Sequence, residues 1–314
     1  MAEATMASTG GANPALTPDP AEPAKPKDPL FYRLLAAALP KLRRRVLPHN
    51  RFGDNLYHWL LFLSKHKRLP RNQMMWNDVL FRIKTTDEIH DPLRVFVSDK
   101  ELVKTYIKAT VGDEYNVPTI AVLKSPAEVD GFEFPERCII KPTHASAQYI
   151  LRRAGEAIDR ERIKSWFRMN YYYAGREVNY RTLRPKVIVE PLVFDSADLT
   201  DYRFFCVDGV PKLIQLDMDR HTRHTRKLFD PEWREMDFCI LYPKSDRVIP
   251  KPDTLAEMLR VARALSAPFS FVRIDLYSDG QKVICGEITN VSANAGGIFN
   301  PLSSEKKASQ ILWG

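Results

Sequence analysis

One stretch near the carboxyl end, FVRIDLYSDGQKVICGEITN at 271–290, constrains the fold most strongly. Apolar and polar residues alternate on both sides of its SDGQ segment, as they do in strands that bury one face. Asp279 and Gly280 tolerate the positive φ angles that a tight hairpin turn requires. The stretch therefore predicts an antiparallel β-hairpin, and each strand carries an acid, Asp275 on the first and Glu287 on the second.

The two acids of the predicted hairpin would lie on neighbouring strands, where their charges repel and their burial is costly. Mg2+ would remove this cost, because it takes hard oxygen ligands from one or two carboxylates and the rest from water and phosphate. Arg273, two residues before Asp275, could neutralise the acids instead. The spacing alone leaves both interpretations open.

Helical and strand patterns alternate through the rest of the chain. They predict strands at 117–123, 138–142 and 186–193, a hairpin at 201–220 that turns at Asp208–Gly209, and helices at 54–70, 98–112, 158–177 and 254–267. Hairpins joined by helices in this way predict largely antiparallel sheets and the α+β class. The four cysteines have no CxxC spacing, so we expect free, buried thiols in a reducing compartment.

Composition divides the chain into three regions. Residues 1–30 are rich in Ala, Pro, Thr and Gly and should be disordered. Residues 31–95 should form a basic helical region, with a short amphipathic helix interrupted near Pro40 and a second helix that Asp54 could cap. Residues 96–314 carry the α+β pattern.

Positive charge is concentrated in one segment. The chain has a formal net charge of +8, and 31–71 alone carries ten lysines and arginines against one acid. Such a surface could meet nucleic acid, anionic lipid or an acidic polymer, or it could be a solvated helical face. We find no zinc finger, aromatic-rich RNA motif or helix-turn-helix pattern, which argues against nucleic acid. The apolar block of the first helix could lie on a bilayer or pack against the protein.

Other charged residues lie near predicted strand ends. Lys141 closes an apolar strand and precedes the small-residue segment THASA, an arrangement that suits phosphate binding but also a structural lysine. Asp201 and Arg203 share one face of a strand and could be a simple ion pair. His144, within THASA, could touch phosphate, and the basic segment DRHTRHTRK at 219–227 could bind an anionic substrate or be a solvated loop.

The motifs of several protein classes are absent from the sequence. There is no HExxH or cysteine–histidine cluster for zinc, no G-x-S-x-G nucleophile and no Walker GxxxxGK[ST] loop. No apolar run reaches the roughly 18 residues of a membrane span, and the N-terminus lacks a signal-peptide pattern. We therefore expect a cytoplasmic protein that is neither a zinc hydrolase, a serine hydrolase nor a P-loop enzyme.

Eight segments together resemble the ATP-grasp superfamily, and within it the TupA-like proteins of teichuronopeptide and cell-surface polysaccharide biosynthesis. In the family's order they are SDKELVKTYI, CIIKPTHAS, WFRMNYYYAGREVNY, VIVEPLV, DYRFFCVDGVPKLIQLDMDRHTRHTRKLFD, FCILYPKSDRVIPKP, FSFVRIDLY and GEITN. NYYYAGRE and DYRFFCVDG are the most specific. The resemblance extends over about 72–301 and implies two α+β lobes that grip ATP between antiparallel sheets. The nucleotide lobe would span about 130–190 and the catalytic lobe about 191–314.

The resemblance also implies roles for single residues. The nucleotide-binding residues would be Lys100, Lys141, His144, Ser146, Glu190, Leu192 and Asp201, with Glu190 and the Leu192 backbone at the adenine. The catalytic residues would be Arg273, which steadies the transferred phosphoryl group, and Arg203. The Mg2+ ligands would be Asp275, Glu287, Thr289 and Asn290.

Two departures from the family pattern stand out. Many relatives carry Asn two residues after the metal-binding Glu, where this chain has Thr289 and then Asn290. On a regular strand only the position of Thr289 returns to the face of Glu287, unless a bulge re-aims Asn290. The HASA loop has alanines where relatives tend to carry glycines, which limits positive φ and close approach of backbone to phosphate.

The activity implied by the resemblance is ATP-dependent carboxylate–amine ligation through an acyl phosphate, with ATP and Mg2+ as cofactors. The carboxylate could belong to an amino acid or to a uronic acid of a glycan, and an amine would be the acceptor. A phosphotransferase acting on a sugar or glycan hydroxyl remains an alternative, as does a catalytically weak nucleotide-binding scaffold. The basic region could bring the protein to the inner face of the membrane.

Overall fold

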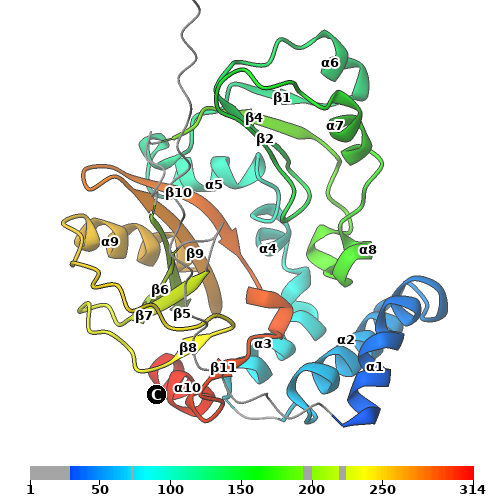
Figure 1. The fold of residues 1–314 in the computed structure, drawn as a ribbon, viewed down its shortest axis with the longest axis vertical. Coiled ribbons are helices and arrows are strands. Elements are labelled where there is room, and N and C mark those ends of the chain that lie inside the picture. The colour runs from blue at the N-terminus through cyan, green and yellow to red at the C-terminus, as the bar shows by residue number, and fades with distance from the viewer. Residues whose placement is uncertain (1–28, 72–73, 194–199, 219–223) are drawn as a thin grey trace, which may run out of the picture.

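The computed structural model describes residues 29–71, 74–193, 200–218 and 224–314. Apart from its last two positions, the predicted disordered tail lies outside these residues. Two main antiparallel sheets with helices around them, and a group of N-terminal helices beside them, make up the described chain (Figure 1). This arrangement confirms the predicted α+β class.

The smaller sheet, at the top of Figure 1, has four antiparallel strands in the order β1-β4-β2-β3. They are β1 (Ala121–Leu123), β2 (Cys138–Pro142), β3 (Ile150–Arg152) and β4 (Val187–Glu190). Helices α6 (Pro126–Gly131) and α7 (Arg160–Trp166) supply Val129 and Ile163 to its apolar core. Alternation along β2 buries Ile140 in this core and turns Lys141 to the other side.

The larger sheet has five antiparallel strands in the order β10-β9-β5-β6-β7. They are β5 (Thr200–Val207), β6 (Val210–Met218), β7 (Thr225–Phe229), β9 (Phe271–Ser278) and β10 (Val283–Thr289). Both predicted hairpins are confirmed. Asp208 and Gly209, with φ of 47° and 75°, join β5 to β6, and Gly280, with φ of 92°, lies in the turn from β9 to β10.

The two faces of the larger sheet are covered differently. Helices α5 (Leu102–Thr110) and α9 (Leu255–Ser266) pack on one face, where Phe204, Ile214 and Ile274 are fully buried. Helices α3 (Trp76–Thr85) and α10 (Ser304–Trp313) cover only one end of the other face, over Phe205, Leu213 and Phe271. Beyond that end, the same alternation of side chains places polar residues on the face that looks towards the smaller sheet.

Shorter elements complete the described fold. Helix α4 (Pro92–Phe96) lies between the two main sheets, and α8 (Tyr172–Gly175) lies between the smaller sheet and the N-terminal helices (Figure 1). Strands β8 (Cys239–Ile240) and β11 (Phe299–Asn300) form a separate two-stranded sheet beside α10. The four cysteines are free and buried, as predicted. In the described ranges no helix combines the length and the apolar character that crossing a membrane requires.

The N-terminal helices differ in two ways from the prediction. Helix α1 (Leu30–Lys41) runs through Pro40 and continues as one π-helical segment at 42–46, so the expected interruption is a change of helix type. Helix α2 (Arg51–His66) begins before Asp54 and is capped by Asn50, whose side chain accepts from the Gly53 N–H.

Asp54 is instead the buried partner of Arg176, which follows α8. Arg176 is fully buried, and its Nη1 lies 2.9 Å from the Asp54 carboxylate. The same guanidinium donates to the carbonyl oxygens of Arg43, Leu47 and Pro48 at 2.6 to 2.8 Å. One side chain therefore fastens the N-terminal helices to the segment that follows α8.

Two other predicted helices are shorter than expected. The predicted helix at 158–177 is divided into α7 and α8, because the Asn170 side chain accepts from the Tyr172 N–H and turns the chain between them. The helix predicted from 98 begins at Leu102, and the Asp99 carboxylate caps it by accepting from the Leu102 N–H at 3.2 Å.

Candidate active site

A row of largely buried polar side chains crosses the face of the larger sheet that α3 and α10 cover at its other end. We call it the charged stripe, and its members are Glu287 and Thr289 on β10, Arg273 and Asp275 on β9, Asp201 and Arg203 on β5, Gln215 and Asp217 on β6, and Arg226 on β7. Strand register aligns them, because Asp275 lies opposite Glu287 on one side and Arg203 on the other. With strands about 4.8 Å apart, the stripe is roughly 19 Å long.

Two arginines of the stripe hold Asp275. The Nε and Nη2 atoms of Arg273 each lie 2.6 Å from one oxygen of the Asp275 carboxylate, and Nη2 also donates to the Thr289 hydroxyl at 3.1 Å. Arg203 Nε lies 3.5 Å from the same carboxylate. The pairing by Arg273 that the sequence left open is therefore present.

Arg203 also bridges two further acids of the stripe. Its Nη2 is 3.0 Å from Asp201, as the shared strand face predicts, and its Nη1 is 2.6 Å from Asp217. Asp217 in turn accepts from Arg226 Nε at 2.5 Å. Burial alone would lower the pKa of Arg203, but these carboxylates raise it above its usual value.

The acids at the β9–β10 end fit a divalent cation by chemistry and position. Burial raises the pKa of Asp275 to about 6, although Arg273 and Arg203 act to lower it. Its carboxylate and that of Glu287 lie on one face at opposed positions. No cluster of three or more metal-binding side chains occurs among the residues that the structure describes. Two carboxylates suffice for Mg2+, which completes its shell with water and phosphate.

Thr289 and Asn290 lie on different sides of β10. The Thr289 hydroxyl accepts from Arg273, within the charged stripe. The buried Asn290 amide instead donates to the Arg94 carbonyl and to Ser98 Oγ, at 2.9 and 3.1 Å, and accepts from the Arg94 guanidinium. The β-bulge of β10 lies between Cys285 and Glu287, too early to re-aim Asn290. Thr289 is therefore the residue that shares the face of Glu287.

Three lysines gather near Glu190 at the end of β4. We call Lys100, Lys104 and Lys141 the lysine cluster. The ammonium groups of Lys104 and Lys141 contact different oxygens of the buried Glu190 carboxylate. Lys100 donates to the Ala145 carbonyl, and burial lowers its pKa while Glu287 acts to raise it. The pKa of Lys100 therefore responds to both charges: Lys141 acts to lower it and Glu287 acts to raise it.

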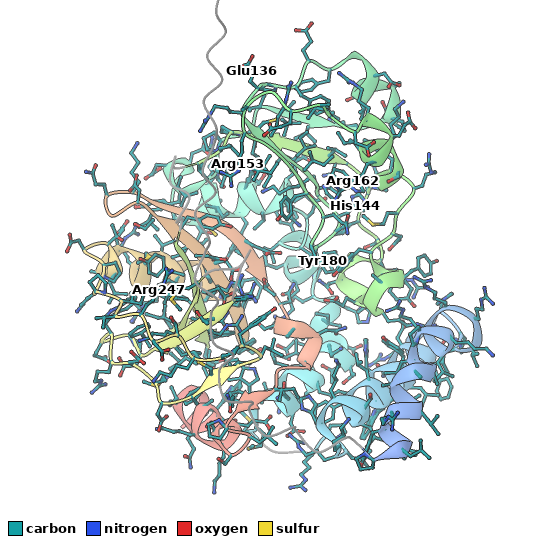
Figure 2. The ribbon with its side chains drawn as sticks, in the orientation of Figure 1. Glu136, His144, Arg153, Arg162, Tyr180 and Arg247 are labelled. Carbon is teal, nitrogen blue, oxygen red and sulfur yellow. The ribbon has the colours of Figure 1, made fainter. Side chains whose placement is uncertain are left out.

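His144 is directed away from solvent in the loop that follows β2. Its Nε2 donates to the Trp166 carbonyl at 3.1 Å, and its Nδ1 accepts from the Lys186 N–H at 3.4 Å. Burial lowers the pKa of this imidazole, so it is a neutral anchor for the loop within the smaller lobe (Figure 2). Both ring nitrogens are therefore used by the protein itself.

The rest of this loop is closer to the space between the sheets. Ser146 is half-buried and hydrogen-bonds to the Tyr171 hydroxyl. Ala147 has φ of 57°, so the chain adopts at an alanine the left-handed conformation that glycine takes without strain. Leu192 is half-buried just after β4, two residues after Glu190 in the chain.

Several site residues were not found from the sequence. Asp217 and Gln215 follow the same two-residue alternation on β6 as Asp201 and Arg203 do on β5, and that signal could have identified them. Lys104 lies four residues after Lys100, which places both on one side of the chain around α5. Glu177 and Lys84, described below, come together only through tertiary structure.

The chain is similar to one protein family and to several solved structures. A family model described as TupA-like ATPgrasp matches residues 80–308. Two D-alanine–D-alanine ligases are structurally similar, from Bacillus anthracis (16% identity, 69% of this chain and 64% of that chain, TM-score 0.39) and from Helicobacter pylori (17% identity, 76% and 69%, TM-score 0.37). The ATP-grasp ligase PsnB in complex with a minimal precursor is also similar (15% identity, 64% and 55%, TM-score 0.35).

The solved structures are matched over only part of their length. The chain spans 64% and 62% of the first two ligase structures that it matches, which is less than two thirds of each. No curated protein matches the chain significantly. The family model alone covers most of the sequence, including both main sheets and the whole charged stripe. The resemblance found in the sequence is therefore confirmed, and the chain belongs to the TupA-like ATP-grasp family.

Proposed function

We propose that the protein is an ATP-dependent ligase that joins a carboxylate to an amine through an acyl phosphate, with release of ADP and phosphate. One observation carries this proposal. The lysine cluster reaches the acid end of the charged stripe through Lys100, whose pKa the Glu287 carboxylate acts to raise. Cations on one side and carboxylates on the other suit the phosphates and the metal of Mg·ATP.

The residues have separate roles in this proposal. Lys100 and Lys141 bind the phosphates of ATP, with Glu190 and the Leu192 backbone nearer the adenine. An oxygen of the substrate carboxylate forms a bond to the γ-phosphorus while the bond to ADP breaks. Arg273 and Arg203 offset the negative charge of the transferred group. Asp275 and Glu287, with Thr289 beside them, hold Mg2+, which when bound neutralises charge on the phosphates.

The substrates follow from the same resemblance. The carboxylate belongs to an amino acid or to a uronic acid, and the product serves the modification of cell-surface polysaccharide in the cytoplasm.

The test is Mg2+-dependent release of ADP from the purified protein. It is screened over the common amino acids as amine donors, with and without glucuronic or galacturonic acid, and over pairs of amino acids. The ligase reaction requires ADP and phosphate to appear together, and an amide to be found by mass spectrometry. A phosphorylated sugar with ADP but no free phosphate would replace the ligase by a phosphotransferase. ATP binding without release under any pairing would favour a scaffold.

We also propose that α1 brings the enzyme to an anionic membrane surface. Leu30, Phe31 and Leu34 are 61 to 65% exposed, although Leu39 on the other side of α1 is buried and the helix packs against α2. The sequence from 29 to 53 contains no acid, and Arg44 and Arg45 are exposed just after the helix. Apolar side chains beside a basic surface suit an interface of anionic lipids.

Vesicle sedimentation tests this contact. The protein should sediment with vesicles of phosphatidylglycerol and phosphatidylcholine, and much less with phosphatidylcholine alone. The double variant L34E/R44E should stay in the supernatant with both, while its rate of ATP turnover in solution is unchanged. Equal sedimentation of this variant and the unchanged protein would contradict the proposal.

A further inference from the structure

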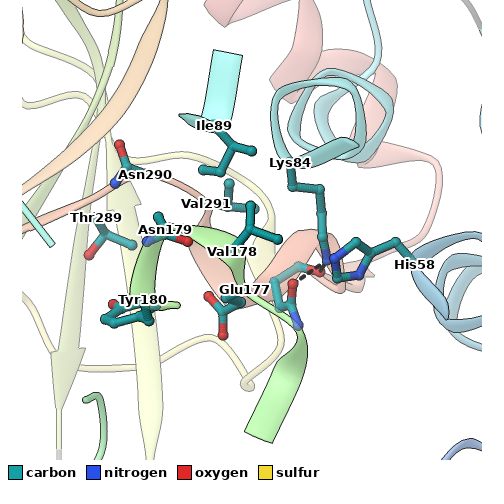
Figure 3. Close-up of a pocket in the computed structure, with 11 residues that line it drawn as sticks. His58, Lys84, Ile89, Glu177, Val178, Asn179, Tyr180, Thr289, Asn290 and Val291 are labelled. Carbon is teal, nitrogen blue, oxygen red and sulfur yellow. Dashed lines mark hydrogen bonds between the residues drawn. The ribbon is translucent and has the colours of Figure 1, made fainter. Parts of the chain in front are cut away.

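A small cavity lies at the end of the charged stripe, between the larger sheet and the N-terminal helices (Figure 3). Its walls come from α2 and α3, from the segment 177–180 and from the end of β10. One wall is Thr289, which accepts from Arg273. The cavity volume is about 20 Å³, which is enough for one water-sized group.

His58, on the α2 wall, presents an acceptor without a donor. Its Nε2 lies 3.0 Å from the Arg176 carbonyl oxygen, which can only accept, so Nε2 carries the proton and Nδ1 keeps its lone pair. The side chain is almost fully buried, and Nδ1 has no hydrogen-bond partner among the described residues. A buried acceptor of this kind is costly unless something donates to it.

Glu177, on another wall, presents two more acceptor oxygens. No residue in the described ranges donates a hydrogen bond to its carboxylate. Burial raises the pKa of Glu177, Lys84 acts to lower it, and Glu287 acts to raise it further. Glu177 therefore lies between the lysine of α3 and the acid end of the stripe.

Lys84 does not satisfy these acceptors. Its ammonium donates to the backbone carbonyl of Asn294 at 3.1 Å and to the side-chain oxygen of the same residue (Figure 3). Burial lowers the pKa of Lys84 to about 7. Tyr180, which lies between the two sheets in Figure 2, adds a hydroxyl to the lining of the cavity beside Glu177.

From this geometry we propose that the cavity is the amine subsite of the ligase, in which Glu177 accepts a hydrogen bond from the attacking primary amine. The inference rests on the proposed carboxylate–amine ligation. A primary amine is water-sized, and its N–H groups match the unpaired acceptors of Glu177 and His58, whereas a carboxylate would meet them with like charge. The amine would belong to an amino acid or an amino sugar.

The position also suits the second chemical step. An amine held in the cavity lies beside Thr289, and so beside the arginine proposed to steady the acyl phosphate. Its nitrogen lone pair forms the bond to the acyl carbon, and the bond from that carbon to the phosphate oxygen breaks. Phosphate leaves with the electron pair and takes up the proton that the amine loses.

The variant Glu177→Gln distinguishes binding of the amine from the first step, which is formation of the acyl phosphate. Hydroxylamine at high concentration traps acyl phosphates from solution, so hydroxamate formation reports the first step alone. The unchanged protein and the variant are compared with Mg·ATP and each carboxylate of the amino-acid and uronic-acid panel, and then with each amine. Glu161→Gln, an exposed acid on α7, is the matched control. Glu177→Asp keeps the charge and tests rescue.

We expect Glu177→Gln to form hydroxamate within about twofold of the unchanged protein, and to raise the KM for the amine roughly tenfold or more. The KM of Glu177→Asp for the amine should lie between the values of the unchanged protein and of Glu177→Gln. An unchanged amine KM would overturn the inference, as would an equal loss of hydroxamate and amide. Failure of the unchanged protein to form hydroxamate from any carboxylate would instead overturn the proposed ligase function, and this subsite with it.

Discussion

The lysine cluster and the charged stripe are balanced in opposite ways. Among the described side chains, Lys104 and Lys141 contact one acid, Glu190, while Glu287, Asp99 and Glu190 all act to raise the pKa of Lys100. The stripe pairs three arginines with four acids. A site that binds a polyanion together with a metal cation needs an excess of positive charge on one side and an excess of negative charge on the other. The comparison is consistent with the proposal that phosphate binds on the side of the lysine cluster and the metal on the side of the stripe.

Removing an acid from the stripe should have the largest effect. Glu287→Gln keeps the size of the side chain but removes the carboxylate opposite Asp275. We expect Mg2+-dependent ADP release to fall about 100-fold or more, because the metal loses a ligand and the phosphates lose its charge. The urea midpoint should change little. Glu161→Gln on the surface is the control, and full activity in Glu287→Gln would refute the metal assignment.

Removing a cation from the cluster should act on binding. Lys141→Ala leaves Glu190 paired with Lys104 but takes away a positive charge that phosphate would meet. We expect the Kd for ATP, measured by calorimetry, to rise about 10- to 100-fold. Lys108→Ala removes an exposed lysine of α5, the helix that carries Lys104. It is paired with Asp113, and its loss should leave the Kd unchanged. Unchanged affinity in Lys141→Ala would remove Lys141 from the site.

The two regions should also respond to pH with opposite sign. Asp275 has a folded pKa of about 6, above its unfolded value, so folding is favoured by protonation and stability is lost as pH rises from about 4 to about 6. Lys100 has a folded pKa below its unfolded value, so the folded state releases its proton first and stability is gained as pH rises towards about 10.4.

Urea unfolding of Asp275→Asn and Lys100→Met across this range measures both slopes. The free energy of unfolding of the unchanged protein minus that of Asp275→Asn should fall by up to about 3 kcal/mol between pH 4 and about 6.5. The free energy of unfolding of the unchanged protein minus that of Lys100→Met should rise at alkaline pH. Slopes of the same sign would contradict the expectation that the two regions respond to pH in opposite directions.

The smallest effect is expected at the loop beside the lysine cluster. Ala147→Gly places glycine where φ is 57°, which relieves strain but increases the entropy of the unfolded chain. We expect a gain of less than about 1 kcal/mol in the free energy of unfolding. Ala145→Gly, at a fully buried position of the same loop, should be destabilising instead. A loss of stability in Ala147→Gly would show that the alanine is not strained.

Local patterns predicted the part of the site that lies on hairpins. Alternation and turn residues predict the two hairpins, but regular pairing from the turn would place Gly286 opposite Asp275. The β-bulge between Cys285 and Glu287 brings Glu287 to that position instead, and the alternation did not predict it.

Contacts between distant segments could not be predicted either. Asp54 fits a helix cap in the sequence, but it is the partner of Arg176, 122 residues away. His144 fits a phosphate ligand, but its ring nitrogens are used by the Trp166 carbonyl of α7 and by the Lys186 N–H.

The cavity beside Glu177 illustrates the same limit. His58, Lys84 and Glu177 come from three separate parts of the chain, and each looks unremarkable within its own helix or loop. Periodicity identifies the buried face of a helix but not which buried position will face a cavity. Only the packing of the N-terminal helices against 177–180 brings the three side chains to one place.

The guanidinium of Arg176 bonds to segments that lie outside the family match. Its four oxygen partners come from residues 43, 47, 48 and 54, all of which precede the start of the family match at residue 80. A fragment cut at that boundary would lose these four partners together with the helices that carry them, so Arg176 would meet water. Phe62, Trp76 and Val79, which belong to the apolar core under the larger sheet, would be lost with them. The N-terminal helices therefore complete the packing of a fold whose family match begins after them.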